Sequence, residues 1–265
     1  MWSKEYMGSR NRSAEDDWDF YFCNVNDVLS SIMVNLGAIG RAPMARKPWL
    51  LWVCVAMRSP REDGLSSDQE APTLAEIEDK LTDELRMASG AELLGRITGN
   101  NCREFYFYAP RNEGLGEAVA KVRESFPAYL IECDSQPDPE WRQYLDVLYP
   151  SPMDMHRIQN RRVLASLEEH GDAHSIPRPV DHAFYFRRDE DREAFVAAAI
   201  GTGFSVQNES EEAERTDERP FFLNLVRTDP VAIDHINQVV LELVELAERF
   251  DGDYDGWGCE VQVAS

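Results

Sequence analysis

The sequence predicts an α+β protein of two ferredoxin-like domains, each a βαββαβ sandwich whose mainly antiparallel sheet carries helices on one face. Three observations lead to this prediction. The chain has 265 residues, more than one domain of ordinary size. Strand-like and helix-like patterns follow one another in the same order twice. Pro150 and Pro152 interrupt helix formation between the two passes. We therefore expect domains at 18–150 and 151–265, after a disordered lead-in at 1–17.

The first pass begins with an aromatic-rich strand at 18–25 and its hairpin partner at 28–36. The continuous apolar run at 49–57 predicts a central strand. Thr73 and Glu76 form the pattern of a capping box, so a helix is expected to start there. The pass is completed by two strands with a turn between them, a helix, a strand and an acidic helix, at 92–98, 104–109, 115–125, 128–133 and 139–148.

The second pass repeats this order after a leading helix at 153–170 and a proline-containing loop at 171–179. The two halves share little residue-level identity, so the repeat supports the fold more strongly than common ancestry. An acidic turn separates the second and third strands of the pass. The predicted elements are a strand, a helix, two strands, a helix and a strand, at 180–186, 189–201, 204–208, 221–227, 230–250 and 254–263.

The charge of the chain restricts its partners. The formal net charge is -22, and the segment 151–265 alone holds 24 acidic and 11 basic side chains. Such a field repels the phosphates of nucleic acid and attracts a basic protein segment. We therefore predict no direct nucleic-acid binding. The acidity is equally compatible with a role in solubility alone.

The cysteines and the apolar runs indicate a cytoplasmic protein. The five cysteines are widely spaced with no CxxC pair, as expected for reduced thiols. Cys23, Cys54 and Cys133 lie in apolar strands and are expected in the core. The first residues lack the apolar stretch of a signal peptide, and no run approaches the length of a membrane span. The sequence does not indicate the oligomeric state.

Each candidate catalytic or metal site in the sequence lacks a residue or a geometry that its chemistry requires. The segment 251–262 begins like a calcium loop, but its twelfth position is Gln262 where a bidentate glutamate is needed. His170 and His174 have a helical metal-binding spacing, but Gly171 ends the helix between them. Asp181 and His182 are adjacent in a strand, so their side chains point to opposite faces. We predict no catalytic residue, no cofactor and no metal ion.

The second half contains a recognisable set of motifs. These are PRPVDHAFYF at 177–186, Ala194 and Phe195 in the next helix, Gly203-Phe204, and the terminal YDGWG at 254–258. Together they resemble the RraB family, the regulators of ribonuclease E activity, over residues 152–263. The first half resembles the DUF695 family over residues 16–149. That resemblance rests on five motifs: PWLL (48–51), DGL (63–65), IED (77–79), GRIT (95–98) and REFYFYA (103–109).

The RraB resemblance implies a non-catalytic, ferredoxin-like domain that binds ribonuclease E or its RNA-degradation assembly and lowers its activity. It implies contact with an arginine-rich region of the enzyme, and the acidity of 151–265 suits that contact. The expected partner-binding residues are Asp181, His182, Asp253, Tyr254, Asp255 and Trp257. For Trp257, packing in the core is the competing and more favoured interpretation.

An alternative function belongs to a different class. The first domain would then bind a small molecule or carry an uncharacterised hydrolytic activity. Converging carboxylates of raised pKa in a deep cleft would favour this alternative. An acidic patch around 253–257 without a cleft would favour the regulator.

Overall fold

The computed structural model describes residues 16–211 and 218–263, which form two compact units that meet in the sequence at Pro152. The predicted lead-in at 1–17 lies almost entirely outside the described residues, as does part of the acidic turn after residue 208. None of the described helices is long and apolar enough to span a membrane.

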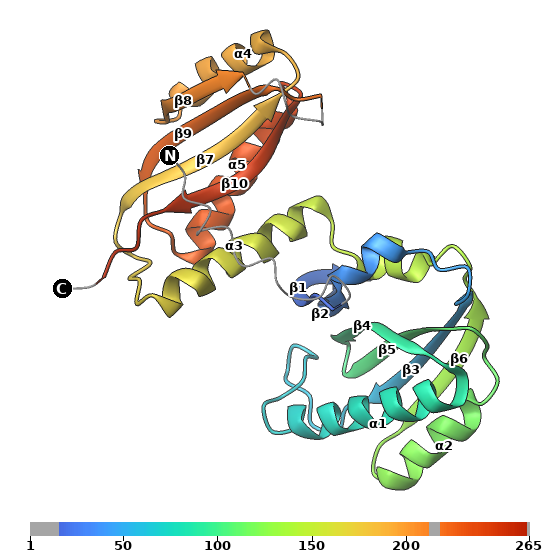
Figure 1. Cartoon of the computed structure of the whole chain (residues 1–265). Coiled ribbons are helices and arrows are strands. Elements are labelled where there is room, and N and C mark those ends of the chain that lie inside the picture. The colour runs from blue at the N-terminus through green and yellow to red at the C-terminus, as the bar shows by residue number, and fades with distance from the viewer. Residues whose placement is uncertain (1–15, 212–217, 264–265) are drawn as a thin grey trace. The chain divides into compact units, whose positions relative to one another are not determined.

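The N-terminal unit is a six-stranded antiparallel sheet in the order β1-β2-β4-β5-β3-β6. Helices α1 (Ala71–Ser89) and α2 (Leu115–Ser125) cover one face of it (Figure 1). Without the β1–β2 hairpin, the order β4-β5-β3-β6 and the sequence βαββαβ are those of a ferredoxin-like fold. The strands are β1 (Trp18–Val25), β2 (Val28–Asn35), β3 (Trp49–Ala56), β4 (Glu92–Gly99), β5 (Cys102–Ala109) and β6 (Ile131–Pro137).

Local sequence explains most of these boundaries, with two corrections: at α1, and at β6, which runs from Ile131 to Pro137 and not over the expected 128–133. Asn100 and Asn101 take φ values of 49° and 62°, so they form the two-residue turn between β4 and β5. The capping box predicted at Thr73 is wrong, because α1 starts two residues earlier, at Ala71. The preceding Glu70 accepts hydrogen bonds from the backbone N–H groups of Arg58 and Ser59. Its carboxylate therefore fixes the loop before the helix.

A cluster of three aromatic residues, Tyr108, Trp141 and Tyr144, covers part of the sheet face opposite α1 and α2. We call this cluster the aromatic cap. All three side chains are fully buried, and the Trp141 ring stacks on Tyr108 at 4.4 Å between centroids. The Trp141 indole N–H donates to the carbonyl oxygen of Lys47 at 2.9 Å. The acidic helix expected at 139–148 is shorter, a single π-helical segment η2 (Gln143–Leu148).

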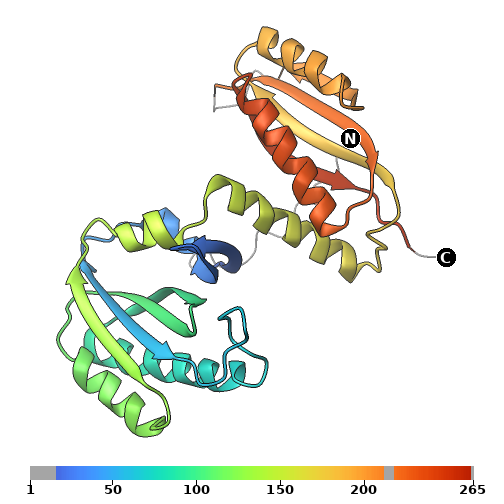
Figure 2. The ribbon, with the colours of Figure 1, turned by 180° about the vertical axis from the view of Figure 1, so that it is seen from behind.

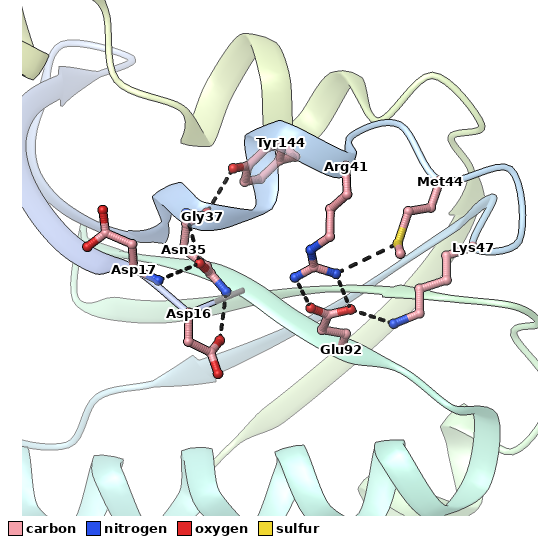
Figure 3. Close-up of polar contacts among 9 residues, drawn as sticks. All are labelled: Asp16, Asp17, Asn35, Gly37, Arg41, Met44, Lys47, Glu92 and Tyr144. Carbon is pink, nitrogen blue, oxygen red and sulfur yellow. Dashed lines mark hydrogen bonds and ion pairs between the residues drawn. The ribbon is translucent and has the colours of Figure 1, made fainter. Parts of the chain in front are cut away.

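A polar network joins the 3-10 helix η1 (Leu36–Arg41), in a segment expected to be a loop, to the sheet beside the aromatic cap (Figure 3). Glu92 of β4 accepts hydrogen bonds from Arg41 and Lys47. Burial raises the pKa of Glu92, but these cations outweigh it and hold that pKa below its usual value. The backbone oxygen of Asn35 accepts the Tyr144 hydroxyl at 2.8 Å. The network thus positions the segment that carries the cap.

The C-terminal unit is a four-stranded antiparallel sheet in the order β10-β7-β9-β8, again the order of a ferredoxin-like fold. The predicted fold class is confirmed for both units. Helices α4 and α5 cover one face of this sheet, and α3 packs against α5 (Figure 2). The elements are α3 (Pro152–Glu169), β7 (Arg178–Phe186), α4 (Asp189–Ile200), β8 (Ser205–Glu211), β9 (Phe221–Asp229), α5 (Ile233–Glu248) and β10 (Gly252–Cys259).

The entry to β10 shows why the calcium-like motif is a turn. Asp251 takes a φ of 49°, and the chain then enters β10. Gly252 does not take a positive φ, and its role is to leave space for a neighbouring ring. A side-chain carbon at this position would lie 2.4 Å from the Phe186 ring, so glycine permits close approach of the two strands. Gly256 does take a positive φ, 134°.

Candidate partner-binding surface

Strand β7 divides the predicted partner-binding residues between the two faces of its sheet. His182 is fully buried on the helix-covered face, between Val180 and Phe184. Asp181 is partly exposed on the opposite face. This division follows from the alternation of side chains along a strand. Asp181 is thus available to a partner, whereas His182 is enclosed in the core.

His182 forms a hydrogen bond with Tyr254 of β10, another predicted contact residue. The Tyr254 hydroxyl lies 2.9 Å from Nδ1 of His182, and the Tyr254 side chain is itself buried. Burial lowers the pKa of His182 to about 3, so the ring is neutral near pH 7. The Nε2 atom of His182 has no hydrogen-bond partner among the described residues. These two residues therefore support the sheet from inside and do not form its surface.

Trp257 connects β10 to the helices. Its indole N–H donates to the side-chain oxygen of Asn160 on α3 at 2.8 Å. Asn160 is buried and donates in turn to Asn237 of α5 at 2.9 Å. The Trp257 ring is partly buried against the core of the unit. The favoured interpretation of Trp257 as a packing residue agrees with this position.

The other two predicted residues lie at a bulge in β10. Asp253 and Tyr254 pair with Tyr185 and Phe184 of β7, and Gly256 pairs with the next residue, Ala183. Asp255 is therefore the additional residue of the bulge. Both Asp253 and Asp255 are exposed. A bulge re-aims a side chain relative to the pleat, and here it presents a carboxylate at the edge of the sheet.

The sheet face opposite α4 and α5 carries a mixed aromatic and acidic surface. No helix or strand of the described residues packs on it. Cross-strand pairing brings Asp253, Tyr185 and Phe222 into one row, and the Tyr185 and Phe222 rings lie 5.2 Å apart. Four residues from Tyr185 along β7, Asp181 accepts a hydrogen bond from Asn224 of β9, whose side chain is buried. We call the surface formed by Asp181, Tyr185, Phe222 and Asp253 the open face.

Sequence reasoning did not single out Tyr185, Phe222 or Asn224. The signal was present in β7, where Asp181 and Tyr185 are separated by four residues and therefore share a face. For β9, the strand register was also needed, because it decides which β9 side chains lie beside Asp181. A sequence alone does not give that register.

The surroundings of Asp181 shift the pKa of its carboxyl group. Burial raises the pKa of Asp181, the Asn224 hydrogen bond lowers it, and the charge of Glu260 raises it. The group that hydrogen-bonds Asp181 is the amide of Asn224, on the adjacent strand β9.

One cluster among the described residues has the composition of a metal site. The ligand atoms of Cys54, Cys102 and Glu104 all lie within 4.8 Å of one another, on the sheet face of the N-terminal unit that carries the aromatic cap. A hydrogen bond between the thiols raises the pKa of Cys54 and lowers that of Cys102. Two sulfurs and one carboxylate suit a soft divalent ion such as zinc. The expectation that Cys54 is a core residue is wrong, because it is only partly buried on this face and lies outside the core cluster under the helices.

The fold and the open face together define a two-unit α+β protein whose C-terminal sheet presents an acidic surface. Two protein families match the chain, one in each unit. Residues 16–149 match the family of unknown function DUF695, and residues 157–259 match regulator of ribonuclease activity B. The chain belongs to the DUF695 family and carries an RraB domain in its C-terminal unit.

Solved structures add little to this assignment. An unknown protein from Galdieria sulphuraria is 10% identical, with 82% of this chain and 99% of that chain covered and a TM-score of 0.22. A protein from Bacteroides thetaiotaomicron is also 10% identical, with 79% and 94% covered and a TM-score of 0.17. At these scores neither likeness bears on the fold or the function. No curated protein matches the chain.

Proposed function

We propose that this protein is a non-catalytic, cytoplasmic regulator that binds ribonuclease E, or its RNA-degradation assembly, and lowers its activity. The observation that carries the proposal is the RraB match over the same unit that bears the open face. That match places the C-terminal unit in a family of ribonuclease regulators. The enzyme as partner, and inhibition as the effect, are the steps we add.

The chemistry of the open face suits an arginine-rich protein segment. Asp181 and Asp253 offer carboxylates that guanidinium groups bind in a bidentate manner. The Tyr185 and Phe222 rings continue the row of Asp253 across β7 and β9, and a guanidinium stacks on aromatic rings of this kind. Each exposed ion pair contributes up to about 1 kcal/mol, so several must act together. A segment with repeated arginines meets that requirement.

The charge of the unit favours a protein partner over RNA. With 24 acidic and 11 basic side chains, residues 151–265 repel a polyphosphate backbone. The same field speeds encounter with a basic segment, and salt screens it over about 8 Å at physiological ionic strength. We therefore propose that regulation works through the enzyme and not through competition for its RNA substrate.

An inhibition assay tests this function. Purified chain is added to two forms of ribonuclease E, one complete and one without its arginine-rich region, and RNA cleavage is followed. We expect slower cleavage by the complete enzyme only, with the effect weakening as salt rises. The chain alone with RNA serves as the control for cleavage by the chain itself. Unchanged cleavage together with no complex at low salt would contradict the proposal.

A further inference from the structure

The N-terminal unit contains a cavity of about 260 Å³ that the regulatory function does not use. It lies between the β1–β2 hairpin, β4 and the loop that follows β3. Three arginines line it together with three large apolar side chains: Arg61, Arg96, Arg103, Phe20, Phe22 and Leu65. In a chain with 49 acidic and 27 basic residues, this grouping of positive charge opposes the overall field.

The topology explains why a cavity forms here. Cross-strand pairing places Phe22, Ser31, Thr98 and Arg103 in one row across β1, β2, β4 and β5. Arg103 is two residues before Phe105, which packs in the core under the helices, so the row lies on the helix-covered face. The hairpin widens the sheet beyond the strands of the ferredoxin-like core, and the loop after β3 closes the cavity from the side.

Arg103 is the residue that points to a ligand. Its side chain is only 6% exposed, and it donates to the hydroxyls of Thr98 and Ser66, each at 3.1 Å. Among the described residues it forms no ion pair with a carboxylate. Burial and the neighbouring Arg96 lower the pKa of Arg103 to about 10, against the opposing charges of Glu78 and Glu70, so its guanidinium is still charged at pH 7. A buried charge with no directly bound counterion is costly unless an anion completes the site.

The carboxylates nearest to this charge are already engaged. Glu78 of α1 accepts a hydrogen bond from Arg96, and both oxygens of Glu70 accept backbone N–H groups. Arg61 pairs with Asp63 at 2.6 Å, but its side chain is 57% exposed at the edge of the cavity. The charges of Arg61 and Arg96 are therefore neutralised by carboxylates that pair with them directly. The charge of Arg103 has no such direct pair and is available to a ligand.

We propose that this cavity binds a small anion that carries an apolar ring. The carboxylate or phosphate of the ligand accepts hydrogen bonds from Arg103, assisted by Arg61, and its ring packs on Phe20 and Phe22. The volume is slightly below the range of roughly 300–1,000 Å³ for drug-sized ligands, so the ligand is small. The Phe20 and Phe22 rings lie edge to face, with their centroids 5.8 Å apart. The Phe22 side chain is half exposed, so its ring is accessible to the ring of the ligand. This site lies in the DUF695 unit and is independent of ribonuclease regulation.

A structural role for Arg103 makes the opposite prediction about stability. If Arg103 serves only to hold Thr98 and Ser66, Arg103→Met should destabilise the unit. If it serves a ligand, Arg103→Met removes an uncompensated buried charge at similar volume, and stability is kept or raised. Stability and binding measured on the same variant therefore separate the two roles.

The test is calorimetric titration of the full chain with phenyl phosphate and with benzoate at low salt. We expect saturable one-to-one binding of at least one of these probes. Arg103→Met should abolish binding without lowering the melting temperature, and Arg61→Ala should weaken it about tenfold to hundredfold, the loss of one charge-assisted hydrogen bond. Arg86→Ala is the matched control, because Arg86 is an exposed arginine of α1 paired with Asp83, and this variant should bind normally.

Three results would overturn the proposal: no binding of either probe, unchanged binding by Arg61→Ala, or a melting temperature that falls in Arg103→Met. Because Arg61 is exposed, its variant is expected to fold even if the Arg103 variant does not. Inorganic phosphate tests the apolar part of the site. It should bind more weakly than phenyl phosphate, and Phe22→Ala should remove most of that difference. Equal affinity of the two phosphates would contradict the ring-binding role of Phe20 and Phe22.

Discussion

The two units share one strand order but treat the sheet face opposite their helices differently. In the N-terminal unit the aromatic cap buries part of that face, and Trp141 at its centre is fully enclosed. In the C-terminal unit no described helix or strand covers the corresponding face, and it presents the open face. The helix-covered face is therefore the constant core of this fold. The opposite face is where the two units have become different.

Their local charges differ as well. The cavity of the N-terminal unit gathers three arginines, whereas the open face of the C-terminal unit presents carboxylates. The net charge of -22 conceals this contrast, because it averages over both units. Partner chemistry is decided by the local surface, and the two units are suited to ligands of opposite sign.

The largest expected loss of stability comes from removing the central ring of the aromatic cap. Trp141→Ala removes a fully buried ring that stacks on Tyr108 and donates to the Lys47 carbonyl. We expect a loss of about 3–5 kcal/mol in the stability of the N-terminal unit. Chemical denaturation followed by circular dichroism measures this loss. Trp52→Ala, a half-buried tryptophan of the same unit, is the control. Equal losses from the two variants would show that the cap has no special role.

A pH effect is expected in the core of the C-terminal unit. Burial lowers the pKa of His182 from 6.5 to about 3 in the folded state. Between these values the unfolded chain binds a proton that the folded unit does not. Stability therefore falls as pH is lowered through this window, by up to about 1.4 kcal/mol per pH unit.

Urea denaturation of the wild type and His182→Gln between pH 6.5 and 4 measures this slope. The variant should show a shallower fall by up to that amount, whereas His170→Gln, at an exposed histidine, should retain the wild-type slope. The same slope in the wild type and in His182→Gln would contradict the assigned burial of this ring.

The smallest expected effect on stability is that of Phe222, which we compare with its neighbour on the opposite face of β9. Leu223 is fully buried on the helix side, and Phe222 is partly exposed on the open face. Leu223→Ala should cost about 2–5 kcal/mol, and Phe222→Ala about 1 kcal/mol or less. Binding of the partner should respond in the reverse order among folded variants. Loss of stability in Phe222→Ala as large as in Leu223→Ala would indicate that the open face is covered.

Much of the fold could be predicted from the sequence, because its strands and helices carry clear patterns. The continuous apolar run of β3 and the Asn100-Asn101 turn led to the observed elements. The errors lie where local and tertiary signals compete. Thr73 has the sequence of a cap, but Glu70 anchors the loop before α1 and the helix begins earlier. The six-residue η2 has no periodic signature, since its position depends on Trp141 packing against Tyr108.

The candidate site was less predictable, because proximity across strands depends on register. Asp181, Asp253 and Asp255 remain predicted contact residues, and all three are exposed or partly exposed. His182 and Tyr254 were selected from the same motifs but form a buried hydrogen bond. Family motifs combine residues that maintain the fold with residues that contact partners. A single sequence does not separate the two kinds.

Binding of an arginine-rich segment of ribonuclease E to the full chain tests the central claim most directly. The comparison is between Asp181→Asn/Asp253→Asn/Asp255→Asn and the control Glu113→Gln/Glu117→Gln/Glu124→Gln, which removes the same charge from exposed positions on and beside α2. We expect the aspartate variant to bind about tenfold more weakly at physiological salt, and the control to bind as the wild type does. Equal weakening in both variants, or none in either, would contradict recognition by the open face.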